Sequence, residues 1–125
     1  MIPRYTRPQM AELWSDVNRL NTWLEVELCA CEAMAEEGLV PGEAAQNLRK
    51  RNFRFDQAHV RRVEEIEERC RHDVIAFLTF LEEELGPEAR WLHKGLTSSD
   101  ILDTSFALLL KRAAEIIEED LERLR

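Results

Sequence analysis

Residues 15–37 read SDVNRLNTWLEVELCACEAMAEE, and their pattern predicts a long amphipathic helix. Ser15 or Asp16 can cap the start of this helix, and Gly38 is suited to end it. Its apolar residues recur at spacings of three and four, namely Val17, Leu20, Leu24, Leu28, Cys31 and Met34 or Ala35. That period places them on one stripe of the helix, which we expect to pack into a core.

The helical period continues on both sides of this stretch, and no segment shows the alternation of a strand. Capping residues, glycines and prolines place the other expected helices at 9–14, 42–50, 56–70 (capped by Asp56), 74–85 and from Ser98, Ser99 or Asp100 to 124. Residues 88–96 are expected to be mostly loop. Two ion pairs are possible on the exposed face of the helix after Asp56, namely Arg61–Glu65 and Glu65–Arg69. No functional role is assigned to His59. The sequence therefore predicts an all-α fold.

Composition agrees with a helical domain and narrows the classes of partner. The 125 residues are 45% hydrophobic and 34% charged, with only four glycines and four prolines. A net charge of −8 argues against a general nucleic-acid binder but not against a small anionic ligand. No run approaches the roughly 18 apolar residues of a membrane span, and the N-terminus does not resemble a signal peptide. Cys29, Cys31 and Cys70 are interpreted as reduced packing residues of a cytoplasmic protein.

The last predicted helix is apolar on more than one side. Leu108, Leu109 and Leu110 cover most of a turn, which predicts neighbours on several faces and self-association. The sequence stops within this pattern without a Gly, Asn or Pro to end the helix. We interpret the chain as a fragment of a longer protein, with a frayed natural terminus as the alternative.

Three polar segments interrupt the amphipathic pattern, and the first is Arg4-Tyr5 with Arg7. Arginine offers a fork of donors to a phosphate, and tyrosine adds a flat ring and a hydroxyl. A basic N-terminal arm that is merely solvated is the alternative.

The second segment is Arg71-His72-Asp73, which lies between two helical stripes. Histidine titrates near neutral pH, and a helix start with an arginine beside it can receive an anion. The alternative is structural, with Asp73 capping the following helix and Arg71 and His72 on its surface.

The third segment runs from His93 to Asp100 and leads into the last helix. Gly95 lets the backbone approach a ligand closely, and the hydroxyls of Thr97, Ser98 and Ser99 lie where unpaired helix N–H groups point outward. The arrangement can hold a carboxylate or a phosphate, although hydroxyl residues are also preferred at any helix start.

Together these segments resemble the adenylosuccinate lyases of the fumarase/aspartase superfamily. The resemblance covers essentially the whole chain, in order. Its main motifs are Ile2-Pro3-Arg4-Tyr5-Thr6-Arg7-Pro8, Trp23-Leu24-Glu25-Val26-Glu27, Arg71-His72-Asp73-Val74 and Gly95-Leu96-Thr97-Ser98-Ser99-Asp100. The resemblance implies an N-terminal helical domain over 1–96 and the start of a central helical bundle over 97–125.

The resemblance also implies a β-elimination in purine synthesis, without a metal or organic cofactor. The substrate would be adenylosuccinate, or the succinylated aminoimidazole carboxamide ribotide, and fumarate would leave. A base takes a proton beside a carboxylate, an acid protonates the departing nitrogen, and fixed donors stabilise the intermediate anion. In the intact homotetramer each active site would draw on three of the four subunits, so the fragment alone is expected to be inactive.

The family's site residues carry over onto matching positions. Arg4 and Tyr5 correspond to its nucleotide-binding pair, and Arg71, His72 and Asp73 to a segment that lines the substrate site, with His72 in a supporting catalytic role. His93, Thr97 and Ser98 complete the predicted substrate-binding set. The principal acid and the catalytic serine loop would lie beyond residue 125.

Two alternatives stay open at this stage. The chain could belong to another lyase of the superfamily, such as one acting on argininosuccinate. It could also be a helical interaction domain that has lost the chemistry.

Overall fold

The computed structural model describes residues 2–125, and within that range every regular element is helical. The prediction of an all-α fold is confirmed. In chain order the elements are η1 (Pro3–Tyr5), α1 (Pro8–Leu13), α2 (Asp16–Glu36), α3 (Gly42–Lys50), α4 (Gln57–Cys70), α5 (Asp73–Leu85), η2 (Pro87–Trp91) and α6 (Ser98–Arg123). Here η marks a short 3₁₀ helix. No helix among these residues is long and apolar enough to cross a membrane.

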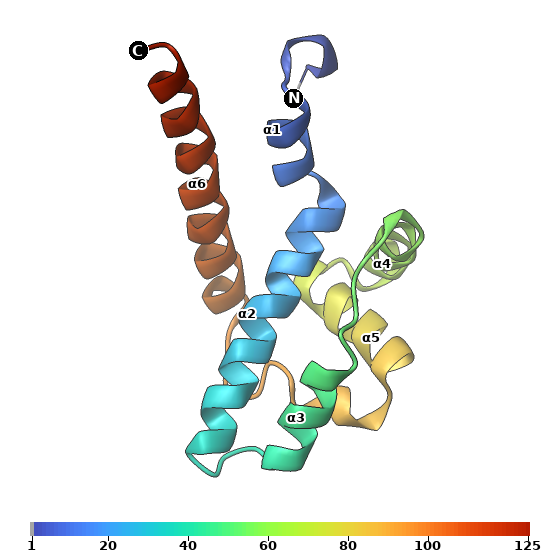
Figure 1. Cartoon of the computed structure of the whole chain (residues 1–125). Coiled ribbons are helices and arrows are strands. Elements are labelled where there is room, and N and C mark those ends of the chain that lie inside the picture. The colour runs from blue at the N-terminus through green and yellow to red at the C-terminus, as the bar shows by residue number, and fades with distance from the viewer. Residues whose placement is uncertain (1) are drawn as a thin grey trace.

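Helix α2 lies at the centre of the arrangement. It packs against α1, α3, α4 and α6, and Figure 1 shows it running between α6 on one side and the α4–α5 pair on the other. Leu20, Leu24, Leu28 and Cys31 are buried, as the stripe predicts. The remaining stripe positions pack against the core while partly exposed, namely Val17, Met34 and Ala35. The most regular pattern in the sequence thus forms the central element.

Aromatic rings fasten α5 to α2. Phe77 of α5 is completely buried and meets Trp23 of α2 edge-on, with 5.5 Å between ring centroids. On its other side Phe77 stacks on Phe55, which precedes α4, at 5.7 Å. Large buried rings of this kind dominate core energetics. The loop before α4 is therefore part of the core.

The start of α4 follows the predicted cap and gives His59 a structural role that the sequence did not assign. The Asp56 side chain accepts hydrogen bonds from the N–H groups of Ala58 and His59, at 2.8 and 2.9 Å. In return, the Asp56 N–H donates to Nδ1 of His59, at 3.1 Å. This reciprocal pair is a capping box in which histidine replaces the usual glutamate. The His59 ring also packs beside Phe53 and Phe80.

The expected loop over residues 88–96 is only partly correct. Residues 87–91 form η2, which packs against α3 and α5, and only 92–97 are turns and irregular backbone. Burial of Ala89 holds this 3₁₀ helix in place, a tertiary contact without a periodic signal. The predicted pairs of Glu65 are also wrong, because Arg62 rather than Arg61 or Arg69 faces it. Arg62 joins Glu65 to Glu83 of α5.

The interpretation of all three cysteines as packing residues is wrong for two of them. Only Cys31 is buried, whereas Cys29 and Cys70 are exposed. Cys70 continues the spacing of the buried Val63 and Ile66, but α4 ends at this residue and its side chain is exposed. All three thiols are free, as expected.

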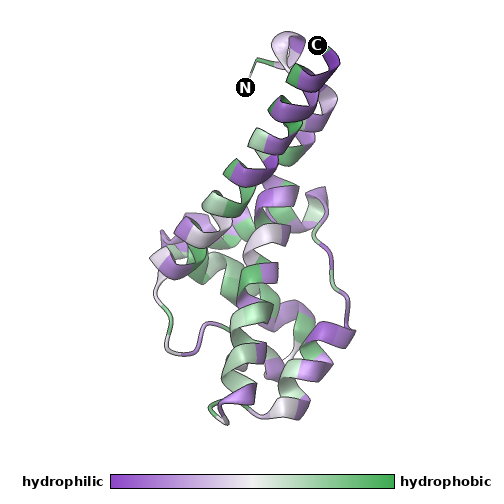
Figure 2. Cartoon of the chain, turned by 60° about the vertical axis from the view of Figure 1, so that its left-hand side comes forward, coloured by the Kyte–Doolittle hydropathy of each residue, from purple (hydrophilic) through white to green (hydrophobic). Residues whose placement is uncertain are grey.

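The two ends of the chain lie at the same end of the molecule, where η1 and α1 run beside the second half of α6 (Figure 1). A small second apolar cluster forms there from Leu13, Leu109 and Ala113. Arg7 adds an ion pair to Asp120. Figure 2 shows hydrophobic and hydrophilic turns mixed along α6. Its exposed large apolar side chains are Phe106, Leu110, Ile117 and Leu121, and the exposed Leu124 follows the helix.

The aromatic contact between α2 and α5 predicts a large effect of Phe77→Ala. Removing a fully buried phenylalanine should lower the free energy of unfolding by about 3 to 5 kcal/mol, because transfer and cavity effects add. Phe106→Ala, which truncates a ring that is 54% exposed, is the matched control and should have a much smaller effect. Urea denaturation followed by circular dichroism measures both, and equal losses would contradict this description of the core.

Candidate functional site

The N-terminal pair lies on the surface. Arg4 and Tyr5 form most of η1, both are exposed, and the Arg4 guanidinium carbon lies 5.0 Å from the centre of the Tyr5 ring. Arg7 is engaged elsewhere, since it binds Asp120 of α6 and Gln9. Arg4 and Tyr5 therefore present a cation and a hydroxyl to solvent, while Arg7 anchors the segment.

The second segment forms the tight junction between α4 and α5. Arg71 ends α4 in the left-handed conformation, with φ of 56°, which is uncommon for a residue other than glycine. His72 then caps α5, because its Nδ1 accepts a hydrogen bond from the N–H of Ile75 at 3.3 Å. An accepting Nδ1 places the ring proton on Nε2, which is left free to donate.

The structural alternative, in which Asp73 caps α5, names the wrong capping residue. Asp73 is the first residue inside the helix, one position beyond the cap, and its carboxylate accepts from the adjacent Val74 N–H at 2.7 Å. His72 holds the extended backbone that a cap requires, and its ring nitrogen supplies the acceptor. A negative charge in the first turn still stabilises the helix.

The third segment begins with a histidine bound to the core. The backbone N–H of His93 donates to one carboxylate oxygen of Glu27 at 2.7 Å, and its ring Nδ1 lies 2.6 Å from the other oxygen. Glu27 is completely buried in α2, and the His93 side chain is 16% exposed. Burial raises the pKa of the Glu27 carboxyl, and the hydrogen bonds from His93 oppose that rise without cancelling it. His93 itself has φ of 61°.

Thr97 and Ser98 form the start of α6. Thr97 is the cap residue and Ser98 the first residue of the helix. The Thr97 N–H donates to the Asp100 carboxylate at 2.8 Å, which fixes the entry of the chain into the helix. The prediction that one of the residues 98–100 begins this helix is confirmed. Exposed helix starts of this kind leave N–H groups available to an anion.

The three segments remain separate in this chain. No hydrogen bond or ion pair within residues 2–125 joins one of them to another. Figure 1 shows η1 at one end of the molecule, whereas α6 begins beside the middle of α2. A single site containing all eight predicted residues therefore requires further chain or further subunits.

Sequence reasoning gave Glu27 no role, although a signal was present. Glu27 follows Trp23 by four residues and precedes Cys31 by four, so it lies on the apolar stripe of α2. A charged residue on a buried stripe needs a partner, because an unpaired buried charge is strongly unfavourable. The partner could not be identified from the sequence, since His93 lies 66 residues away.

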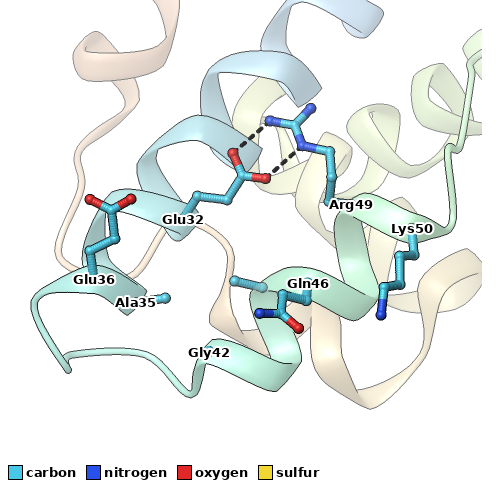
Figure 3. Close-up of a pocket in the computed structure, with 8 residues that line it drawn as sticks. Glu32, Ala35, Glu36, Gly42, Gln46, Arg49 and Lys50 are labelled. Carbon is cyan, nitrogen blue, oxygen red and sulfur yellow. Dashed lines mark hydrogen bonds and ion pairs between the residues drawn. The ribbon is translucent and has the colours of Figure 1, made fainter.

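One sizeable surface hollow contains none of the predicted site residues. It has a volume of about 530 Å³ and lies between α2 and α3 (Figure 3). Its arginine, Arg49, is already bound by Glu32 at 2.7 and 2.8 Å and by Glu25 at 2.8 Å. These hydrogen bonds lower the pKa of both carboxyls. The guanidinium of Arg49 is therefore already neutralised by neighbouring carboxylates.

The arrangement of helices is that of the fumarate lyase fold. A crystal structure of a fumarate lyase from Mesorhizobium sp. BNC1 superposes with a TM-score of 0.80 and 25% sequence identity, covering 91% of this chain and 27% of that one. The chain belongs to the lyase family, whose model matches residues 3–125. An adenylosuccinate lyase from Bacillus subtilis (strain 168) is 50% identical over 123 residues. That match covers 98% of this chain and 28% of the relative's length.

The buried Glu27 predicts a pH-dependent effect of Glu27→Gln. Because the folded state raises the pKa of this carboxyl, it binds more protons than the unfolded state, and its contribution to stability falls as pH rises past the ordinary value of 4.5. The unfolding free energy of the wild type should therefore decline relative to that of Glu27→Gln, by about 1.4 kcal/mol for each unit that separates the two pKa values.

Urea denaturation at a series of pH values measures this difference. Glu36→Gln removes a carboxyl from the exposed side of the same helix and controls for the loss of one negative charge. A wild type that gains stability over Glu27→Gln with rising pH would contradict the assignment.

Proposed function

We propose that this chain is the N-terminal part of an adenylosuccinate lyase, a C–N lyase of purine nucleotide synthesis in the cytoplasm. The intact enzyme would cleave adenylosuccinate to AMP and fumarate, and the succinylated aminoimidazole carboxamide ribotide to its amide and fumarate. The observation that carries the proposal is 50% identity to a protein of that name along 98% of this chain. The predicted site motifs lie inside the matched length.

The geometry of the polar segments supports a role in binding an anionic substrate. Within residues 2–125 only three residues other than glycine have a positive φ, namely Asn52, Arg71 and His93. Two of these three belong to the predicted site, and strained backbone is concentrated at functional sites. The exposed Arg71 stands beside the start of α5, where an anion meets both its guanidinium and the helix dipole.

The proposed roles follow from these positions. Arg4 and Tyr5 would bind the nucleotide portion, and Thr97 and Ser98 the succinyl carboxylates through hydroxyl and N–H donors. His72 would assist with its free Nε2, and Asp73 would line the site beside it. The main acid and base would come from chain outside these residues, so the 125-residue chain alone would lack turnover.

The exposed face of α6 supports a proposal about assembly. We propose that α6 is the beginning of a central helical bundle over 97–125, which joins four subunits in the intact protein. Its uncovered apolar residues recur at helical spacing, as in Phe106, Leu110, Ile117 and Leu121. A row of exposed apolar side chains of this kind is typical of a surface that binds another protein.

An assay of fumarate release tests the proposed reaction. The full-length natural protein should release fumarate from adenylosuccinate and not from argininosuccinate, and the purified 125-residue chain should release none. In the full-length protein Arg71→Ala should lower kcat/KM by about tenfold to a hundredfold, because a hydrogen bond to a charged group is lost.

Arg69→Ala removes the same charge from the exposed end of α4 and should remain close to wild type. Cleavage of argininosuccinate instead of adenylosuccinate would favour another lyase of the superfamily. Absence of any lyase activity in the full-length protein would favour an interaction domain.

Sedimentation velocity tests the proposed assembly face. The 125-residue chain should self-associate with rising concentration, and the double variant Leu110→Lys/Ile117→Lys should stay monomeric because two charges would have to be buried. Ile75→Lys, at an apolar position of α5 that is 46% exposed, should associate like the wild type. A wild-type chain that is monomeric at high concentration would contradict the proposal.

A further inference from the structure

Glu27 is the one ionisable residue among the buried polar side chains of residues 2–125, which are Thr22, Glu27 and Ser105. The other two are explained locally, because each hydroxyl donates to a carbonyl of its own helix. Glu27 instead binds a residue 66 positions away, across the interior. A leucine at this position would continue the apolar stripe without burying a charge. Packing alone therefore does not account for Glu27.

Both oxygens of the Glu27 carboxylate contact the same residue, His93. One accepts the backbone N–H of His93 at 2.7 Å, and the other meets ring Nδ1 at 2.6 Å. The carboxylate thereby fixes the backbone of His93, which has the uncommon φ of 61°, and the rotation of its ring. Two contacts from one rigid group define where the imidazole lies.

The contact also selects the protonation of the ring. When Glu27 is ionised its oxygen can only accept, so Nδ1 then carries the proton and Nε2 is the nitrogen left for other partners. Glu27 is fully buried whereas the His93 side chain is 16% exposed, so the accessible part of the ring is the edge away from Glu27. When the ring takes a second proton, that edge becomes an N–H donor beside a balancing buried carboxylate.

We propose that Glu27 is a positioning residue of the substrate site, which holds His93 with Nδ1 protonated so that Nε2 meets an anionic oxygen of the substrate. The identity of the substrate rests on the proposed function, but the positioning does not. The oxygen belongs either to a carboxylate of the succinyl portion or to the phosphate of the nucleotide.

The protonation is tested by NMR on the full-length protein labelled with ¹⁵N at histidine. In the wild type His93 should keep its proton on Nδ1 throughout the neutral pH range, although neutral histidine in water favours Nε2. In Glu27→Leu the ring should revert to the Nε2 form. A wild-type His93 with Nδ1 unprotonated would overturn the proposal, and this measurement needs no variant to fold.

Titration with anions tests the ligand. Fumarate and AMP are added separately, and one of them should shift the His93 Nε2 resonance, which shows whether the carboxylate or the phosphate is the partner. The shift should be lost or strongly reduced in Glu27→Gln. A His93 resonance that responds to neither anion would overturn the substrate contact.

Kinetics on the full-length protein separate positioning from general stability. Glu27→Gln and His93→Ala should each lower kcat/KM by about tenfold or more, as expected when the partner that orients a histidine is lost. The double variant should be no worse than His93→Ala alone, because both act through one ring. Thr22→Val, which perturbs a buried position of the same helix, should leave kcat/KM unchanged.

Additive losses in the double variant would overturn the positioning role, as would a Glu27→Gln enzyme with wild-type kinetics. If the wild type cleaves no succinylated nucleotide, the proposed function fails. The protonation of Nδ1 and the anion titration would then still decide the inference by themselves.

Discussion

Burial of one face of α2 is the constraint on which the rest of this structure depends. Helices α3, α4 and α6 pack along α2, and α5 joins it through the ring contact between Phe77 and Trp23. The apolar face of α2 must be removed from water along its whole length, so neighbours are needed at each turn. Segments far apart in sequence are brought together because each covers part of the same stripe.

The helices could be predicted from the sequence because their signals are local. Helical period, Asp56 as a cap and Gly86-Pro87 as a stop all act within a few residues, and the structure agrees with them. Sequence patterns miss one tertiary contact and one local choice between neighbouring capping side chains. The 3₁₀ helix η2 is held by Ala89 against α3 and α5, and His72 rather than Asp73 caps α5. Neither result has a periodic signature.

In the candidate site, too, local features could be predicted from the sequence and the spatial arrangement could not. Sequence reasoning located three polar segments at helix starts and ends, since those residue types are recognisable beside an amphipathic pattern. The positive φ of Arg71 and His93 could not be predicted from residue type, because neither is a glycine, which adopts this conformation without steric cost. The three segments remain apart in this chain, which spans 28% of the length of the lyase relative that it matches.

Glu27 connects the packing of the core with the geometry of the segment that begins at His93. The stripe that makes α2 central also carries a carboxylate into the interior, where it is held by the first residue of the segment that leads into α6. Packing of α2 therefore sets the position of His93, and the backbone from His93 to Thr97 starts from a point that the core has fixed. A substitution that shifts α2 would move the ring and the start of α6 together. The geometry of the segment from His93 to Thr97 is therefore set by the core, because the buried Glu27 carboxylate binds both the backbone and the ring of His93.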